Sequence, residues 1–113
     1  MYVYRVENEG GKGPYNTGEA LGERIMAKHN NNKEFPSVWN DIPKNYNEWR
    51  TYCCACPTLK ELKAWFKGFW PELVKEGYYI AIYSVPEKHT IMGISKKQIL
   101  FRKDKAKRMK RKA

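Results

Sequence analysis

The sequence lacks any apolar stretch long enough to cross a bilayer. Its longest apolar run, Tyr78 to Val85, is far shorter than the roughly 20 residues that a membrane helix needs. A basic leader followed by an apolar stretch of about 7 to 15 residues, which marks secretion, is also missing from the first residues. We therefore expect a cytoplasmic protein that has no membrane partner.

Catalytic motifs are missing as well. There is no HExxH and no GxSxG, and the glycine-rich segment from Gly10 to Gly13 lacks the GK[ST] ending of a P-loop. The two histidines, His29 and His89, lie far apart in the sequence, and no neighbouring residue completes a nucleophilic dyad. The sequence therefore favours a non-enzymatic protein without a cofactor, with a plain turn at the glycines.

Cysteine is scarce, since Cys53, Cys54 and Cys56 are the only three and fall in one short segment. An odd set of closely spaced cysteines cannot form an ordered disulfide framework, so we expect reduced thiols. The adjacent pair departs from the spacing of about two to four residues that structural zinc sites favour. We expect small buried thiols, with a metal site made with His29 or His89 as the weaker alternative.

Aromatic residues, by contrast, are abundant. They make up 14% of the chain, and hydrophobic residues together make up 42%, which is too rich for a disordered polypeptide. A length of 113 residues suits one domain with one modest core. We expect Trp39 and Trp49 to pack inside that core rather than to form a ligand platform.

Basic charge is concentrated near the C-terminus of a chain whose net charge is +10. The segment 102–112 contains one acid, Asp104, and eight basic residues: Arg102, Lys103, Lys105, Lys107, Arg108, Lys110, Arg111 and Lys112. We predict a compact domain over residues 1–101 and a basic tail over residues 102–113. Such a tail either contacts nucleic acid through its phosphates or stays solvated.

Local patterns predict an α+β domain, in which a small antiparallel or mixed sheet is packed by two or three helices. Alternation predicts a strand at 2–6, with Tyr2, Tyr4 and Val6 on one face. Thr58 and Glu61 form a capping-box pattern that opens an amphipathic helix. The remaining expectations are a helix at 19–29 ended by the asparagines that follow, irregular chain at 35–46, a break or second helical turn at Pro71, strands at 78–85 and 98–101, and a strand or loop at 90–94.

A resemblance to known proteins lies in four groups of residues: Tyr4-Arg5-Val6-Glu7, Gly13-Pro14-Tyr15, Trp65-Phe66 and Gln98-Ile99-Leu100-Phe101. Together they resemble small proteins encoded by bacteriophages. More distantly, the arginine of the first strand and the late Gln-Ile-Leu-Phe strand are similar to the mono-ADP-ribosyltransferase fold. In that family the arginine helps to bind NAD, a serine-containing strand braces the pocket, and a glutamate activates the acceptor or the ribose.

This second resemblance implies a ligand pocket made by Tyr4, Arg5 and Gln98, braced by a strand near Tyr52 to Cys56. Gln98 stands at the position of the glutamate, and cysteines replace the serines. An amide cannot act as the carboxylate base of the transfer. The resemblance is therefore compatible with a degenerate member that binds NAD.

Three functions agree with these observations. The preferred one is a non-enzymatic phage or mobile-element accessory protein that binds a host protein or ribonucleoprotein in the host cytoplasm, with inhibition of a nucleic-acid-handling or defence system as one result. The second is a nucleic-acid-binding module that uses the basic tail. The third is a degenerate ADP-ribosyltransferase-like NAD-binding protein or enzyme.

Overall fold

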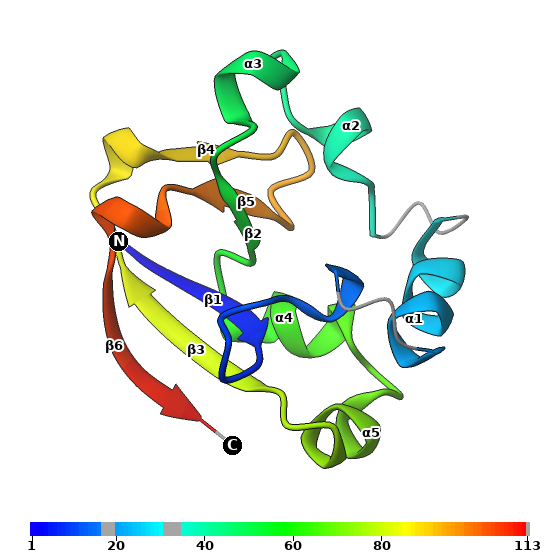
Figure 1. Cartoon of the computed structure of the whole chain (residues 1–113). Coiled ribbons are helices and arrows are strands. Elements are labelled where there is room, and N and C mark those ends of the chain that lie inside the picture. Colours follow the sequence, from blue (N-terminus) through cyan, green and yellow to red (C-terminus); the bar gives the residue numbers. More distant parts are fainter. Residues whose placement is uncertain (17–19, 31–34, 113) are drawn as a thin grey trace.

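In a computed structural model, the described residues, 1–16, 20–30 and 35–112, form two antiparallel sheets and five α-helices (Figure 1). This arrangement confirms the α+β class. The strands are β1 (Tyr2–Glu7), β2 (Cys53–Ala55), β3 (Tyr79–Ser84), β4 (Thr90–Met92), β5 (Ile99–Phe101) and β6 (Lys107–Lys112). The helices are α1 (Ala20–Asn30), α2 (Val38–Asp41), α3 (Tyr46–Trp49), α4 (Leu59–Trp65) and α5 (Trp70–Lys75).

Each sheet has three strands. One sheet has the order β1-β3-β6 and the other the order β2-β5-β4. The sheets meet where Tyr4 of β1 and Cys56, which follows β2, exchange two backbone hydrogen bonds of 2.9 and 2.8 Å. β1 therefore lies between β3 and the end of β2, as Figure 1 shows, although the three segments are far apart in the sequence.

Alternate residues of β1 and β3 point into two separate cores, as the two-residue period of a strand requires. Val6 and Ile80 pack with the residues of α1, α4 and α5. Val3 and Tyr83 face the other way and pack against the second sheet, where Phe101 is fully buried. The alternation predicted for the first strand is confirmed.

Helix α4 begins where its capping pattern predicts. Thr58 is the N-cap, and its Oγ1 accepts a hydrogen bond of 3.1 Å from the backbone N–H of Glu61. Pro71 lies in the first turn of α5, so it opens a second helix. Gly77 follows α5 with a φ of 90°, a left-handed conformation that ends a helix and favours glycine.

The other helices show where sequence patterns are weaker. α1 fills the segment expected to be helical, while Glu19, Asn31 and Asn32 lie outside the described residues. The segment 35–46 is not irregular throughout, because it holds α2 and the start of α3. These helices have four residues each, which is too short to produce a helical period in the sequence. Within the described ranges, no helix is long and apolar enough to span a membrane.

The basic segment is part of the first sheet. Residues Lys103–Lys105 form a 3-10 turn, η3, and β6 then pairs with β3 from Lys107 opposite Ser84 to Lys112 opposite Ile80 (Figure 1). A strand of like charges can pair in this way because the ladder uses backbone groups only. The exposed charges of Lys107 and Arg108 oppose the addition of a further strand at this sheet edge. Residues 107–112 thus belong to the folded sheet, where the sequence suggested a separate tail.

Candidate functional site

Arg5, the arginine singled out by the sequence, is buried on β1 with only 9% of its surface exposed. Its Nη1 donates a 2.8 Å hydrogen bond to the backbone oxygen of Cys54, and Nη2 makes a weak 3.5 Å bond to that of Gly11. Its Nε is buried and has no partner among the described residues. The glycine loop closes over this guanidinium, since a Cβ on Gly13 would lie 3.5 Å from Nη2.

Gln98 is buried with a different set of partners. Its Nε2 donates hydrogen bonds of 2.9 Å to the carboxylate of Asp41 and 2.8 Å to the backbone oxygen of Pro36. Both amide hydrogens are therefore used inside the protein. Arg5 and Gln98 share no partner in these contacts, and the ligand pocket implied for them stays a prediction.

Asp41 is the centre of a buried network that sequence reasoning missed. Besides Gln98, its carboxylate accepts hydrogen bonds from the backbone N–H of Ser95 at 2.7 Å and from the Ser95 hydroxyl at 2.8 Å. A Cβ on Gly93 would lie 2.1 Å from Oδ2 of Asp41. The network fastens α2 to the loop before β5, and no local pattern signals it because Asp41 lies more than 50 residues before its partners.

A surface groove of about 530 Å³ lies between α4, α5 and β3. Its lining consists of Lys63, Ala64, Lys67, Trp70, Val74, Tyr78, Tyr79 and Ile80. None of the three residues expected to form a ligand pocket, Tyr4, Arg5 and Gln98, lines this groove. Tyr4 instead packs, partly buried, against the larger core.

Lys103 is engaged in the structure rather than open to a phosphate. Its Nζ forms an ion pair of 3.1 Å with Glu7, which is 1% exposed, and donates to the backbone oxygen of Gly11 at 3.2 Å. The other carboxylate oxygen of Glu7 accepts a 2.5 Å hydrogen bond from the Tyr83 hydroxyl. Burial, and then the bond to Glu7, raise the pKa of Tyr83, so this tyrosine stays neutral. Glu7 thereby fixes the turn that leads into β6.

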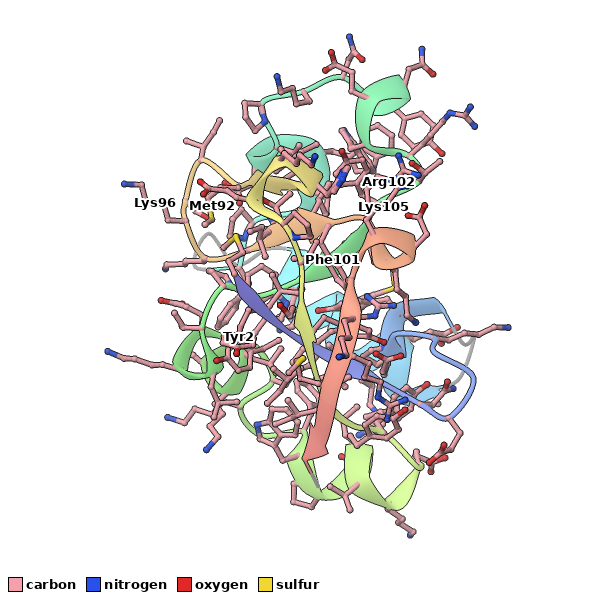
Figure 2. The ribbon with its side chains drawn as sticks, turned by 90° about the vertical axis from the view of Figure 1, so that its left-hand side faces the viewer. Tyr2, Met92, Lys96, Phe101, Arg102 and Lys105 are labelled. Carbon is pink, nitrogen blue, oxygen red and sulfur yellow. The ribbon has the colours of Figure 1, made fainter. Side chains whose placement is uncertain are left out.

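The other basic residues of the segment 102–112 differ in their contacts and in their exposure to solvent. Arg102 pairs with Asp104 at 2.7 Å, and the Arg108 guanidinium lies 5.0 Å from the centre of the Tyr79 ring. Lys105 and Lys107 are exposed. Figure 2 shows Arg102 and Lys105 together at the turn above β6. Lys110, Arg111 and Lys112 pair with β3 through their backbones, and a role for any of these eight residues in binding nucleic acid stays a prediction.

Three aromatic side chains form a cluster on the outer surface of α2 and α3, which we call the aromatic cluster: Trp39, Tyr46 and Trp49. The expectation that Trp39 packs in the core is wrong, because 70% of its surface is exposed. Tyr46 is 49% exposed, and Trp49 is partly buried. Composition suggests burial for tryptophan. However, α2 turns Asp41 inward, and Trp39, two residues before it, lies on a different face of the helix.

His29 is a buried structural residue. Its Nε2 lies 2.7 Å from the backbone oxygen of Trp65, so Nε2 must carry the proton. The other ring nitrogen, Nδ1, then accepts the 2.5 Å hydrogen bond from the Tyr15 hydroxyl, which itself accepts one from Nε1 of Trp65. Both ring nitrogens are occupied, which leaves no lone pair for a metal.

The three cysteines have different environments. Cys56 is buried, as predicted, and burial raises the pKa of its thiol to about 12. Cys53 is partly buried and Cys54 is exposed, so the prediction of burial is wrong for Cys54, whose strand lies at the rim of the second sheet. Among the described residues, no three histidine, cysteine or acidic side chains are grouped to hold a metal ion.

The described part of the chain therefore defines a small basic α+β protein whose buried polar side chains are mostly paired internally. Its distinctive surface features are the aromatic cluster and the basic edge strand. The whole chain, residues 1–113, matches the family model described as Bacteriophage T4 Y00F protein, and it belongs to that family. This agrees with the resemblance to small phage proteins. No curated protein matches the chain. No solved structure matches it either.

Proposed function

We propose that this phage protein is a non-enzymatic accessory protein that binds a macromolecule of the host through its aromatic cluster. The exposure of Trp39 carries the proposal, because tryptophan left in solvent beside other aromatic rings is typical of an interaction surface. The net charge of +10 favours an anionic partner. If that partner is a nucleic-acid-handling or defence enzyme, occupation of its surface inhibits it.

Capture from host cells tests this proposal. We expect a host macromolecule to co-purify with the tagged wild-type chain. The amount captured by a Trp39→Ser/Tyr46→Ser variant is expected to be about tenfold lower, because both removed rings are exposed and such aromatic residues carry much of the binding energy of an interface. Val74→Ser is the matched control, since Val74 is exposed to a similar extent but lies on α5. Equal capture by wild type and the double variant would remove the aromatic cluster from the function.

A nucleic-acid-binding module is the alternative reading of the same surface charge. The exposed Lys105 and Lys107 support it. Deletion of the basic segment is a poor test, because β6 pairs with β3 and its loss exposes a buried strand. Nuclease treatment during the capture experiment separates the alternatives, since it releases a nucleic-acid partner and leaves a protein partner bound.

A degenerate ADP-ribosyltransferase-like NAD-binding protein is the third candidate, and two observations support it. The three segments that the resemblance names are neighbours in space: β1 carries Arg5, β2 bonds to Arg5 through Cys54, and β5, which follows Gln98, pairs with β2. The unpartnered Nε of Arg5 is a donor that an anionic ligand could use. The glycine loop at Gly11 covers it and must open first.

Thermal unfolding with and without NAD tests this candidate. If NAD binds beside Arg5, millimolar NAD raises the melting temperature, because a ligand that binds only the folded state stabilises it. No ADP-ribose transfer is expected, since Gln98 offers an amide where the family has a carboxylate. Inorganic phosphate is the control for a nonspecific anion effect, and an unchanged melting temperature with NAD would eliminate this candidate.

A further inference from the structure

We infer that the partner is a single-stranded nucleic acid, whose bases stack on the aromatic cluster and whose phosphates follow the basic residues between α3 and β6. This inference rests on the proposed function and names its partner. It joins two surface features: the rings of Trp39, Tyr46 and Trp49, and the cations near the start of β6.

The aromatic cluster is arranged in advance for stacking. The rings of Trp39 and Tyr46 are stacked at 5.3 Å with an angle of 20°, and Trp49 meets them edge-on at 5.1 and 5.0 Å. Trp49 is held in place by a 3.2 Å hydrogen bond from its Nε1 to the backbone oxygen of Lys44. Trp39 remains the most exposed ring of the three, so it offers a π-face to a nucleobase without rearrangement.

The surroundings of the aromatic cluster suit a nucleic acid. The exposed residues on α2, α3 and their connections are mostly polar or basic. The polar and charged ones are Ser37, Asn40, Lys44, Asn45, Asn47, Glu48 and Arg50. Amide groups can bond to base edges and the two cations to phosphates. The acid among them, Glu48, accepts a hydrogen bond from the backbone of Asn45 at the start of α3.

The basic residues continue from the aromatic cluster toward the first sheet. Arg50 directly follows α3, and the chain then enters β2, where Cys53 pairs with Phe101, the residue before Arg102. Lys105 and Lys107 come next, both exposed. In both figures η3 lies below α3 on the way to β6, and Figure 2 shows Arg102 and Lys105 in that position. A strand of phosphates along this side would meet Arg50, Lys105 and Lys107, and one exposed acid, Asp104, which is paired with Arg102.

Single-stranded nucleic acid fits this surface better than a duplex does. Stacking on Trp39 needs an unpaired base, while the bases of a duplex already stack on each other. A duplex can use only the phosphate contacts, which depend steeply on salt. We therefore expect a preference for single strands that persists at higher salt.

Fluorescence anisotropy with labelled oligonucleotides of about 12 residues tests the inference directly. Oligo-dT and oligo-U are expected to bind the full chain at least about tenfold more tightly than a duplex of the same length. Trp39→Ala is expected to weaken binding by about 10- to 100-fold through the lost stacking. Arg50→Gln is expected to weaken it several-fold and to reduce the salt slope by about one.

The controls separate stacking from charge and from misfolding. Tyr46→Phe keeps the ring and is expected to bind like wild type, whereas Tyr46→Ala is expected to lose affinity. Lys63→Gln removes a cation from the distant groove and is expected to leave binding unchanged. Absence of binding at low salt, equal affinity for the duplex, or wild-type affinity in Trp39→Ala would each overturn the inference. Nuclease-resistant capture that still depends on Trp39 would leave the proposed function standing and identify a protein partner instead.

Discussion

Replacement of Gly93 by alanine is expected to destabilise the fold by about 3 kcal/mol, which lowers the melting temperature by roughly 10 to 20 °C. A Cβ at this position would lie 2.1 Å from Oδ2 and 2.8 Å from Cγ of Asp41, and 3.1 Å from the backbone oxygen of Gln98. The carboxylate cannot retreat without breaking its hydrogen bonds to Ser95 and Gln98. Urea unfolding followed by circular dichroism measures the loss.

Gly10→Ala is the matched control, because a Cβ there would meet only the side-chain oxygen of Asn8, at an ordinary 3.4 Å. It is expected to change the unfolding free energy by less than about 1 kcal/mol. If Gly93→Ala were as stable as this control, the contact between Asp41 and the loop before β5 would be absent in solution.

The substitution Gln98→Glu is expected to cost on the order of 3 kcal/mol at pH 7. It removes the N–H groups of Gln98 that donate to Asp41 and to the backbone oxygen of Pro36. It also places a second carboxylate about 2.9 Å from that of Asp41, the length of the present hydrogen bond. Two buried carboxylates at that distance do not both ionise, so the folded variant retains a proton that the unfolded chain releases. Its stability is therefore highest at acidic pH and is lost as pH rises.

Gln98→Met provides the comparison for the charge, since it removes the same donors and adds no carboxylate. It is expected to lose about 1 to 3 kcal/mol equally at pH 5 and pH 7. Unfolding curves of both variants at the two pH values separate the effects. A pH-independent difference between the variants would contradict the close pairing with Asp41. The experiment also tests whether Gln98 is held by Asp41 rather than facing a ligand.

Much of the fold could be predicted because its signals are local. The Thr58 cap, the alternation of the first strand and the Gly77 terminus each depend on a few neighbouring residues, and each lies where expected. The candidate site could not be predicted in the same way. The burial of Gln98 depends on Asp41, which is 57 residues away in the sequence. No local sequence pattern around either residue indicates this contact.

Two predictions differ from the structure for the same physical reason: the burial of Trp39 and the separate basic tail. Trp39 was expected in the core and the basic segment outside the domain, because hydrophobicity and charge are the strongest signals of burial and exposure in a sequence. In the structure, burial depends instead on where each segment lies in the fold. Trp39 lies on a four-residue helix at the surface, and Lys107 joins the open edge of β3 through its backbone, where its charge costs nothing.

The pairing of β1 with β3 affects how the chain folds during synthesis. Glu7 and Tyr83, which share a hydrogen bond between these strands, are 76 residues apart. When β1 leaves the ribosome it has no strand to pair with, and Tyr4 and Val6, which pack in the larger core of the folded protein, stay uncovered while most of the chain is made. Contacts of such long range slow folding. The first sheet therefore forms late, and a chain interrupted before β3 exposes an aromatic, aggregation-prone strand instead of a partly functional domain.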